Sequence, residues 1–173
     1  TALALAVTHP SAGNIGGGGF LLIRLADGRV TFIDFRERAP AGASRDMYLD
    51  ASGKVIPEAS TVGPRAAGVP GTVAGLEYAS RKYGKLRWRR VVEPAVRLAA
   101  RGFPVSYELA RSLSSKGTVR LLERFPESKR IFLRGGRYYE PGERLLQPDL
   151  ARTLRRIQRG GAREFYQGET SRR

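Results

Sequence analysis

The sequence lacks several residue types on which protein sites are often built. It contains no cysteine, which excludes disulfide bonds and thiolate metal ligands. Its single histidine, His9, excludes any site that needs two imidazoles. No apolar run approaches the roughly 20 residues that a membrane-spanning helix needs, and no basic segment followed by an apolar one indicates a signal peptide. We expect neither a metal nor a cofactor.

Positive charge is what the sequence has in excess. It carries 31 lysines and arginines against 16 acidic residues, a net charge of +15. Such a balance is typical of proteins that bind nucleic acid or an anionic membrane. The arginines are not gathered in a tail, however, and many, such as Arg97 and Arg101, fall where a solvated helix surface explains them. A basic nucleic-acid-binding module is therefore kept as an alternative, and no nucleic-acid partner is expected.

The first half of the chain predicts a β-hairpin. Residues 20–25 and 29–35 form two strand-like runs, and Asp27-Gly28 between them is a strong signal for a two-residue hairpin turn. Both runs are apolar on both faces, which predicts a sheet covered on both sides. Residues 50–53 predict a further turn.

The second half predicts a block of helices. The expected ranges are 72–83, 88–101 with Pro94 at its first turn or at a kink, 107–115 capped by Ser106, 119–125 capped by Thr118, 148–158 closed by Gly160-Gly161, and a last one from 163 to 173. Short extended pieces are expected within 131–146, around Gly135-Gly136 and Pro141-Gly142. A hairpin followed by helices indicates the α+β class. Because the chain opens and closes on helix-like segments, we expect residues 1–173 to be one partial domain, truncated at both ends.

Four features invite a binding or catalytic interpretation that their context does not support. The glycines at 16–19 lack the Lys-Ser/Thr of a phosphate loop and precede a strand, so close approach to another backbone segment explains them better. An N-terminal threonine can be a nucleophile, but Thr1 leads directly into a helical alanine-leucine stretch. His9, alone at a helix exit, predicts a hydrogen-bonding role at that end. The pairs Asp34/Glu37 and Asp46/Asp50 follow no spacing typical of acid–base catalysis.

Arg36 is the strongest candidate for a binding residue. It directly follows the predicted strand, where a rigid scaffold meets a loop. A guanidinium there can bind a carboxylate through two hydrogen bonds, with Asp34 or Glu37 fixing its orientation. Simple pairing of Arg36 with these neighbours is an equally good interpretation of the local sequence.

Five stretches of the sequence together resemble the heavy-subunit region of bacterial gamma-glutamyltranspeptidases (glutathione hydrolases). They lie at residues 4–10, 13–20, 33–40, 69–75 and 164–168, in the order of that family. The most distinctive are Gly13-Asn14-Ile15 followed by four glycines and Phe20, and Asp34-Phe35-Arg36-Glu37. They cover nearly the whole chain.

The resemblance implies part of a four-layer αββα N-terminal-nucleophile hydrolase, made as a zymogen that cleaves itself into heavy and light subunits. The expected reaction is cleavage of γ-glutamyl amides through a γ-glutamyl-threonine intermediate, followed by transfer to water or to an amino acid or peptide acceptor. Arg36 is implied to bind the α-carboxylate of the γ-glutamyl group. No catalytic residue is expected in this chain, which alone should be inactive, because the light subunit would carry the nucleophile.

The resemblance also implies partners and a location. The expected partners are the light subunit, glutathione and other γ-glutamyl compounds, and the place of action is periplasmic or extracellular. Cephalosporin and glutaryl acylases share the same fold family and stay open as an alternative, because their substrates also carry a carboxylate.

Overall fold

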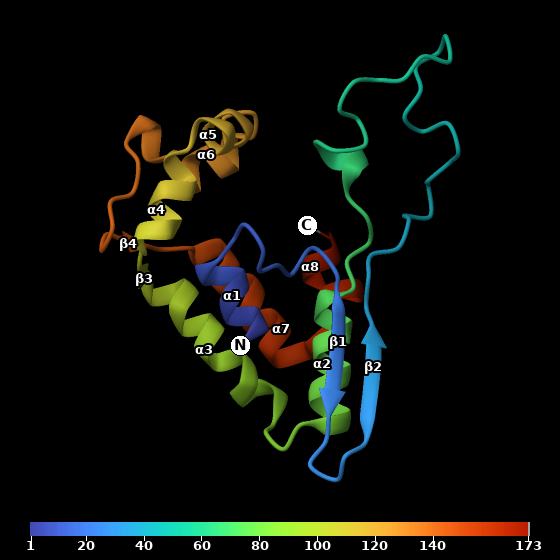
Figure 1. Ribbon diagram of the computed structural model, residues 1–173, viewed down its shortest axis with the longest axis vertical. Helices are drawn as coiled ribbons and strands as arrows, with labels where there is room; N and C mark the ends of the chain where they lie inside the picture. Colours follow the sequence, from blue (N-terminus) through green and yellow to red (C-terminus); the bar gives the residue numbers. More distant parts are fainter. Residues whose placement is uncertain (173) are drawn as a thin grey trace. The chain divides into compact units, whose positions relative to one another are not determined.

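A computed structural model describes residues 1–172 of the chain (Figure 1). The chain divides into two compact units. One is Ile15–Ala79, and the other combines Thr1–Asn14 with the chain from Ser80 onward. The boundary falls inside helix α2, Thr72–Tyr83. The α+β class is confirmed.

The unit Ile15–Ala79 is built on the expected hairpin. Strands β1 (Phe20–Arg24) and β2 (Val30–Asp34) pair antiparallel, with Phe20 opposite Asp34 and Leu22 opposite Phe32. The loop between the strands has three residues, 26–28, rather than the two predicted. The Leu25 N–H donates to the Arg29 carbonyl at 2.8 Å across this loop. Gly28 closes that loop with a φ of +89°, a conformation that glycine adopts without strain.

One face of this hairpin is exposed, contrary to the prediction that both are covered. Phe20, Leu22 and Phe32 retain 54%, 71% and 59% of their accessible surface. Their places in the register put them on one face, while the intervening residues Leu21 and Ile33 on the other face are half-buried. The period-2 alternation of a strand therefore separates two apolar faces that differ in burial.

The rest of this unit is mostly irregular. It contains the 3-10 turn η1, Pro64–Ala66, and isolated bridges that join Leu49 to Val55 and Arg38 to Val69. The predicted turn at 50–53 is confirmed, because the Asp50 carboxylate accepts hydrogen bonds from the Ser52 and Lys54 N–H groups. These bonds, with the one from the Ser52 hydroxyl as the largest cause, lower the Asp50 pKa.

The second unit is a helical core. Helix α1 (Ala2–Thr8) packs on α3 (Trp88–Arg101), which packs on α7 (Pro148–Gln167). Their contact faces supply fully buried side chains: Val7, Val92, Ala99, Leu154 and Ile157. Pro94 lies inside α3 rather than in its first turn, so the first of the two predicted placements is wrong. Gly102, with a φ of +72°, ends the helix. Helix α7 is interrupted at Gly161, which has a non-helical backbone where a helix end was predicted.

Shorter elements complete this unit. Strands β3 (Phe103–Pro104) and β4 (Arg144–Leu145) pair antiparallel. The short helical elements are α4 (Tyr107–Ser114), α5 (Lys116–Leu122), α6 (Pro126–Phe132), the 3-10 turn η2 (Arg134–Gly136) and α8 (Glu169–Arg172). Arg173, the end of the last predicted helix, lies outside the described residues. None of the described helices is long and apolar enough to cross a membrane.

One predicted cap is right and one is wrong. The Ser106 hydroxyl accepts the Leu109 N–H at 3.2 Å and caps α4 as expected. The next helix begins at Lys116 rather than Val119, because Ser115, not Thr118, provides the cap. Its hydroxyl accepts the Thr118 N–H at 3.4 Å, so Thr118 lies inside the first turn. Of the extended pieces expected within 131–146, the one around Gly135-Gly136 is wrong, because the 3-10 turn η2 lies there, whereas β4 follows closely after Pro141-Gly142.

Candidate functional site

Arg36 lies two residues beyond the end of β2, with its backbone fixed and its guanidinium exposed. The Arg36 N–H donates to the Asp34 carboxylate at 2.9 Å. The Arg36 Nε lies 3.9 Å from the nearest Glu37 carboxylate oxygen, and the Arg36 side chain is 67% exposed. Asp34 therefore holds the main chain rather than the guanidinium, and Glu37 is only a distant ion-pair partner. This arrangement leaves the guanidinium donors available to a ligand.

The Arg36 guanidinium lies over the aromatic ring of Phe20. The guanidinium carbon lies 5.8 Å from the centre of the Phe20 ring, a distance at which a cation is attracted to an aromatic face. Phe20 in turn stacks on Phe32, with ring centres 5.6 Å apart. Sequence reasoning missed this contact. The signal that could have found it is the hairpin register, which places Phe20 opposite Asp34 and so beside the end of β2.

Glycines allow other segments to approach the main chain on either side of Arg36. A Cβ on Gly18 would lie 2.6 Å from the Phe35 carbonyl oxygen and 2.8 Å from the Arg36 Cα. A Cβ on Gly71 would overlap the same Phe35 carbonyl, and one on Gly75 of α2 would overlap the Phe35 ring. The structural interpretation of the glycine run is thus supported at Gly18, where a side chain would collide with backbone.

Backbone hydrogen bonds hold these segments together. The Phe35 N–H donates to the Gly19 carbonyl at 3.0 Å, and Arg38 and Val69 exchange bonds of 3.0 and 2.8 Å. The Gly17 carbonyl accepts the N–H groups of Gly71 and Thr72 at 2.8 and 3.0 Å. The strand end that carries Arg36 is therefore fixed between residues 17–19 and 68–71.

Three other residues weighed from the sequence, Thr1, His9 and Asp50, are engaged in local structure of their own. Thr1 and His9 occupy the two ends of α1 in the other unit. Asp50 is engaged by its own turn. Within residues 1–172 no group of three or more histidine, cysteine, aspartate or glutamate side chains is placed to hold a metal ion.

Comparison with known proteins adds the family. The model of the family described as gamma-glutamyltranspeptidase matches residues 1–173. The chain belongs to the gamma-glutamyltranspeptidase family.

Members of this family resemble the chain in sequence and in structure. The glutathione hydrolase proenzymes of Pseudomonas sp. strain A14 and Escherichia coli K12 are 51% and 48% identical to it, over 97% and 95% of this chain. They are matched over only 29% and 28% of their own length, so the chain spans less than a third of these relatives. The crystal structure of Helicobacter pylori gamma-glutamyltranspeptidase matches 99% of this chain and 49% of its own, with a TM-score of 0.92 and 44% identity.

An acylase resembles the chain less closely than these transpeptidases. The structure of cephalosporin acylase from Bacillus halodurans has a TM-score of 0.82 and 25% identity, and it covers 99% of this chain and 32% of its own. The gap in identity favours the gamma-glutamyltranspeptidase interpretation over the acylase alternative.

Proposed function

We propose that this chain is the part of a gamma-glutamyltransferase that holds the α-carboxylate of the γ-glutamyl substrate, through Arg36. The single observation that carries the proposal is the state of Arg36: a fixed main chain, a guanidinium with one ion-pair contact of 3.9 Å within residues 1–172, and 67% exposure. The family to which the chain belongs supplies the reaction class.

The chemistry of a guanidinium suits this role. Its planar fork of N–H donors can form two parallel hydrogen bonds with a carboxylate. Such a contact fixes both the position and the orientation of the substrate's α-carbon end. In a γ-glutamyl donor three carbon atoms separate the α-carboxylate from the reacting amide carbonyl. An anchor at the α-carboxylate therefore determines where that carbonyl lies.

The remaining steps belong to the rest of the protein. We propose a light subunit that carries a nucleophilic threonine, released by cleavage of a precursor. The threonine hydroxyl attacks the γ-carbonyl, the amine leaves, and water or an amino acid or peptide acceptor takes the γ-glutamyl group from the threonine ester. The names of the closely similar relatives, glutathione hydrolase proenzymes, support a precursor whose processed form acts on glutathione. A periplasmic or extracellular location is also part of the proposal, and cell fractionation tests it.

Replacement of Arg36 by alanine in the full-length processed enzyme tests the proposal. We expect the KM for γ-glutamyl-p-nitroanilide to rise and kcat/KM to fall by roughly thirtyfold to a thousandfold, which corresponds to about 2–4 kcal/mol for a lost charged contact. Arg24→Ala is the matched control, because Arg24 is an exposed arginine at the end of β1 in the same hairpin. A KM unchanged from wild type in the Arg36→Ala enzyme refutes the assignment.

A second substrate separates the two hydrolase alternatives. A glutaryl amide carries the terminal carboxylate of a γ-glutamyl amide but lacks its amino group. We expect the wild-type enzyme to cleave γ-glutamyl-p-nitroanilide and to leave glutaryl-p-nitroanilide largely intact. Efficient cleavage of the glutaryl compound alone assigns the protein to the acylases instead.

A further inference from the structure

A groove lined by arginines runs between α3 and α7, in the unit that does not contain Arg36. Its volume is about 260 Å³. Charged side chains from both helices line it: Arg89, Glu93, Arg97 and Arg101 from α3, and Arg155 and Arg159 from α7. All five arginines are exposed.

The spacing of these arginines is unfavourable for the isolated helices. Arg97 and Arg101 are four residues apart on α3, as are Arg155 and Arg159 on α7, so each pair brings two like charges to one helix face. Such pairs destabilise a helix by about 0.2–0.5 kcal/mol each. On α3, Glu93 lies four residues from both Arg89 and Arg97 and partly offsets this repulsion, whereas no acidic residue lies between Arg155 and Arg159 on α7. Like charges kept together without such compensation are more typical of a site than of a surface made only for stability.

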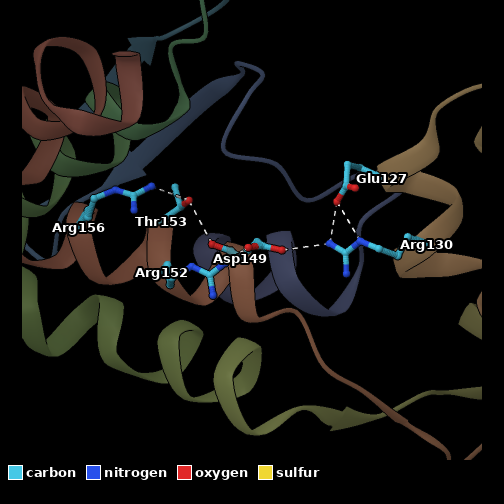
Figure 2. A network of polar contacts seen from close by, with 6 residues as sticks. All are labelled: Glu127, Arg130, Asp149, Arg152, Thr153 and Arg156. Atoms are coloured by element: carbon cyan, nitrogen blue, oxygen red, sulfur yellow. Dashed lines mark hydrogen bonds and ion pairs between the residues drawn. The ribbon is translucent and has the colours of Figure 1, made fainter. Parts of the chain in front are cut away.

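Several arginines elsewhere in the same unit are paired with acidic side chains. Arg130 lies between Glu127 and Asp149, at donor–acceptor distances of 2.7 and 3.1 Å, and Arg152 pairs with Asp149. These residues are drawn in Figure 2. On α4, Arg111 pairs with Glu108 at 2.6 Å. Within residues 1–172 none of the five groove guanidiniums makes an ion pair or a side-chain hydrogen bond. Arg81 and Arg120, outside the groove, also lack such contacts within residues 1–172. What distinguishes the groove is therefore that five unpaired guanidiniums gather on two facing helices.

The frame of the groove is held by contacts between the two helices. The Gln158 side-chain amide donates to the Arg89 carbonyl at 2.9 Å and to the Glu93 carboxylate at 2.6 Å. The Trp88 indole N–H donates to the Ile157 carbonyl at 2.9 Å. Glu93, the one acidic residue of the lining, is thus engaged at the helix interface. Five guanidiniums therefore face the groove with one carboxylate between them.

We propose that this groove binds a linear oligophosphate. Arg89 and Arg101 are separated along α3 by roughly 18 Å at 1.5 Å per residue, which suits a chain of regularly spaced anionic groups better than a single small anion. Guanidiniums bind phosphoryl oxygens through their N–H forks. The apolar part of the lining is limited to Val96 and Ala100, too little to anchor the side chains of a peptide. No aromatic residue lines the groove, so it offers no surface on which nucleic-acid bases could stack.

Binding of short-chain linear polyphosphate to the full-length processed enzyme, measured by isothermal titration calorimetry at low and at moderate salt, tests this site. We expect the wild type to bind, more weakly as salt rises. We expect the double variant Arg97→Gln/Arg159→Gln to raise the Kd by about tenfold, since two exposed charge contacts are lost. Activity toward γ-glutamyl-p-nitroanilide serves as the check that this variant is folded, because no groove residue belongs to the unit that contains Arg36.

The double variant Arg81→Gln/Arg120→Gln is the matched control, since both of its arginines are exposed and outside the groove. We expect it to bind polyphosphate as the wild type does. Equal weakening in both double variants would attribute binding to overall charge and overturn the site. The site is also overturned if the wild type does not bind polyphosphate. It is overturned as well if anionic phospholipid vesicles or single-stranded DNA bind at the groove and polyphosphate does not compete with them.

Discussion

Arg36 owes its place to interactions of the main chain around it. The Asp34 carboxylate fixes its N–H, and bonds from Phe35 to Gly19 and from Arg38 to Val69 fix the residues on either side. Within residues 1–172 the guanidinium has one ring contact, with Phe20 at 5.8 Å, and one ion-pair contact, with Glu37 at 3.9 Å. An anchor built in this way loses little conformational freedom of its backbone on binding, because folding has already removed it.

Gly18→Ala should damage this anchor, and Gly16→Ala should not. A Cβ at Gly18 would lie 2.8 Å from both the Arg36 Cα and the Glu37 N, whereas a Cβ at Gly16 would meet nothing within 4 Å. We expect Gly18→Ala to lower stability on the order of 1–3 kcal/mol through overpacking and to raise the KM. Gly16→Ala should change stability by less than about 0.5 kcal/mol.

Thermal unfolding and steady-state kinetics on the two full-length variants make this comparison. Because both glycines belong to one run, the pair separates collision with the Arg36 main chain from a general loss of loop flexibility. Equal losses in the two variants would contradict the account.

At the residue scale the sequence was sufficient to single out Arg36 but not its environment. The position of Arg36 after a strand could be predicted from the apolar run before it. The partner of Asp34 could not, because a carboxylate two residues back can bond either to the N–H or to the guanidinium of Arg36. The packing of Gly71 and Gly75 against Phe35 joins residues far apart in sequence, which local patterns do not specify.

At the scale of elements, the connection before β4 depends on Glu143. Its carboxylate accepts the Glu140 N–H and an Arg134 N–H, both at 2.8 Å, and lies 3.5 Å from Arg137. The hydrogen bond from Glu140 is the largest cause that lowers the Glu143 pKa, followed by that from Arg134. Arg134 has a φ of +45°, uncommon for a residue other than glycine, and it lies 4.7 Å over the Tyr139 ring.

Glu143→Gln should therefore lower the melting temperature in a pH-dependent way. A carboxyl whose pKa is lower in the folded than in the unfolded state stabilises the fold above its unfolded pKa, and this contribution is lost as pH falls through its folded pKa. We expect the variant to melt below wild type at neutral pH, and the two to converge in acid below the usual glutamate pKa of about 4.3. Calorimetric melting over this pH range measures the effect.

Glu140→Gln is the control for that series, because Glu140 contributes its main-chain N–H to Glu143 and its own side chain is exposed. We expect its melting curve to follow wild type throughout. A Glu143→Gln difference that stays constant with pH would show that the carboxylate charge is not what stabilises the connection.

The helix caps show why the bounds of some helices were predicted more accurately than those of others. Ser106 was identified because it stands alone before an apolar-periodic segment. Before α5, Ser115 and Thr118 are both good capping residues, and they bond to each other at 2.9 Å. Local sequence does not decide between two caps one turn apart. Helix α3 was placed well because its apolar periodicity extends over many turns. For α7 the start at Pro148 and the break near Gly160-Gly161 were predicted, but not its continuation to Gln167 as one element.

At the scale of the whole molecule, Gln147 links distant parts of the helical unit. Its side-chain amide donates to the Val7 carbonyl at 2.8 Å, and its N–H donates to the Ala99 carbonyl at 3.0 Å. Gln147 is only 6% exposed. Helices α1, α3 and α7 therefore meet at this one residue.

Gln147→Met should destabilise the protein while preserving side-chain volume. The Val7 carbonyl would lose a buried partner, which costs about 1–3 kcal/mol. Gln167→Met is the matched control, because Gln167 is exposed at the end of α7, and it should change stability by less than about 0.5 kcal/mol. Urea denaturation of the full-length variants gives both values. A Gln147→Met protein as stable as wild type would rule out this hydrogen bond as a link.

The sequence predicted the α+β class and the order of elements across the molecule, because alternation and helical periodicity are local properties. It did not predict the division into two units or the exposed apolar face at Phe20, Leu22 and Phe32. Both depend on which segments meet in space. The family itself emerged from motifs such as Asp34-Phe35-Arg36-Glu37, whose meaning lies in their combination.

The central claim, that Arg36 binds the substrate α-carboxylate, is tested most directly with two substrates and two enzymes. The substrates are γ-glutamyl-p-nitroanilide and 4-aminobutanoyl-p-nitroanilide, which is the same molecule without the α-carboxylate. The wild-type enzyme should prefer the first strongly in kcat/KM, and Arg36→Ala should lose at least roughly thirtyfold of that preference. If Arg36→Ala slows both substrates by the same factor, Arg36 does not bind the α-carboxylate.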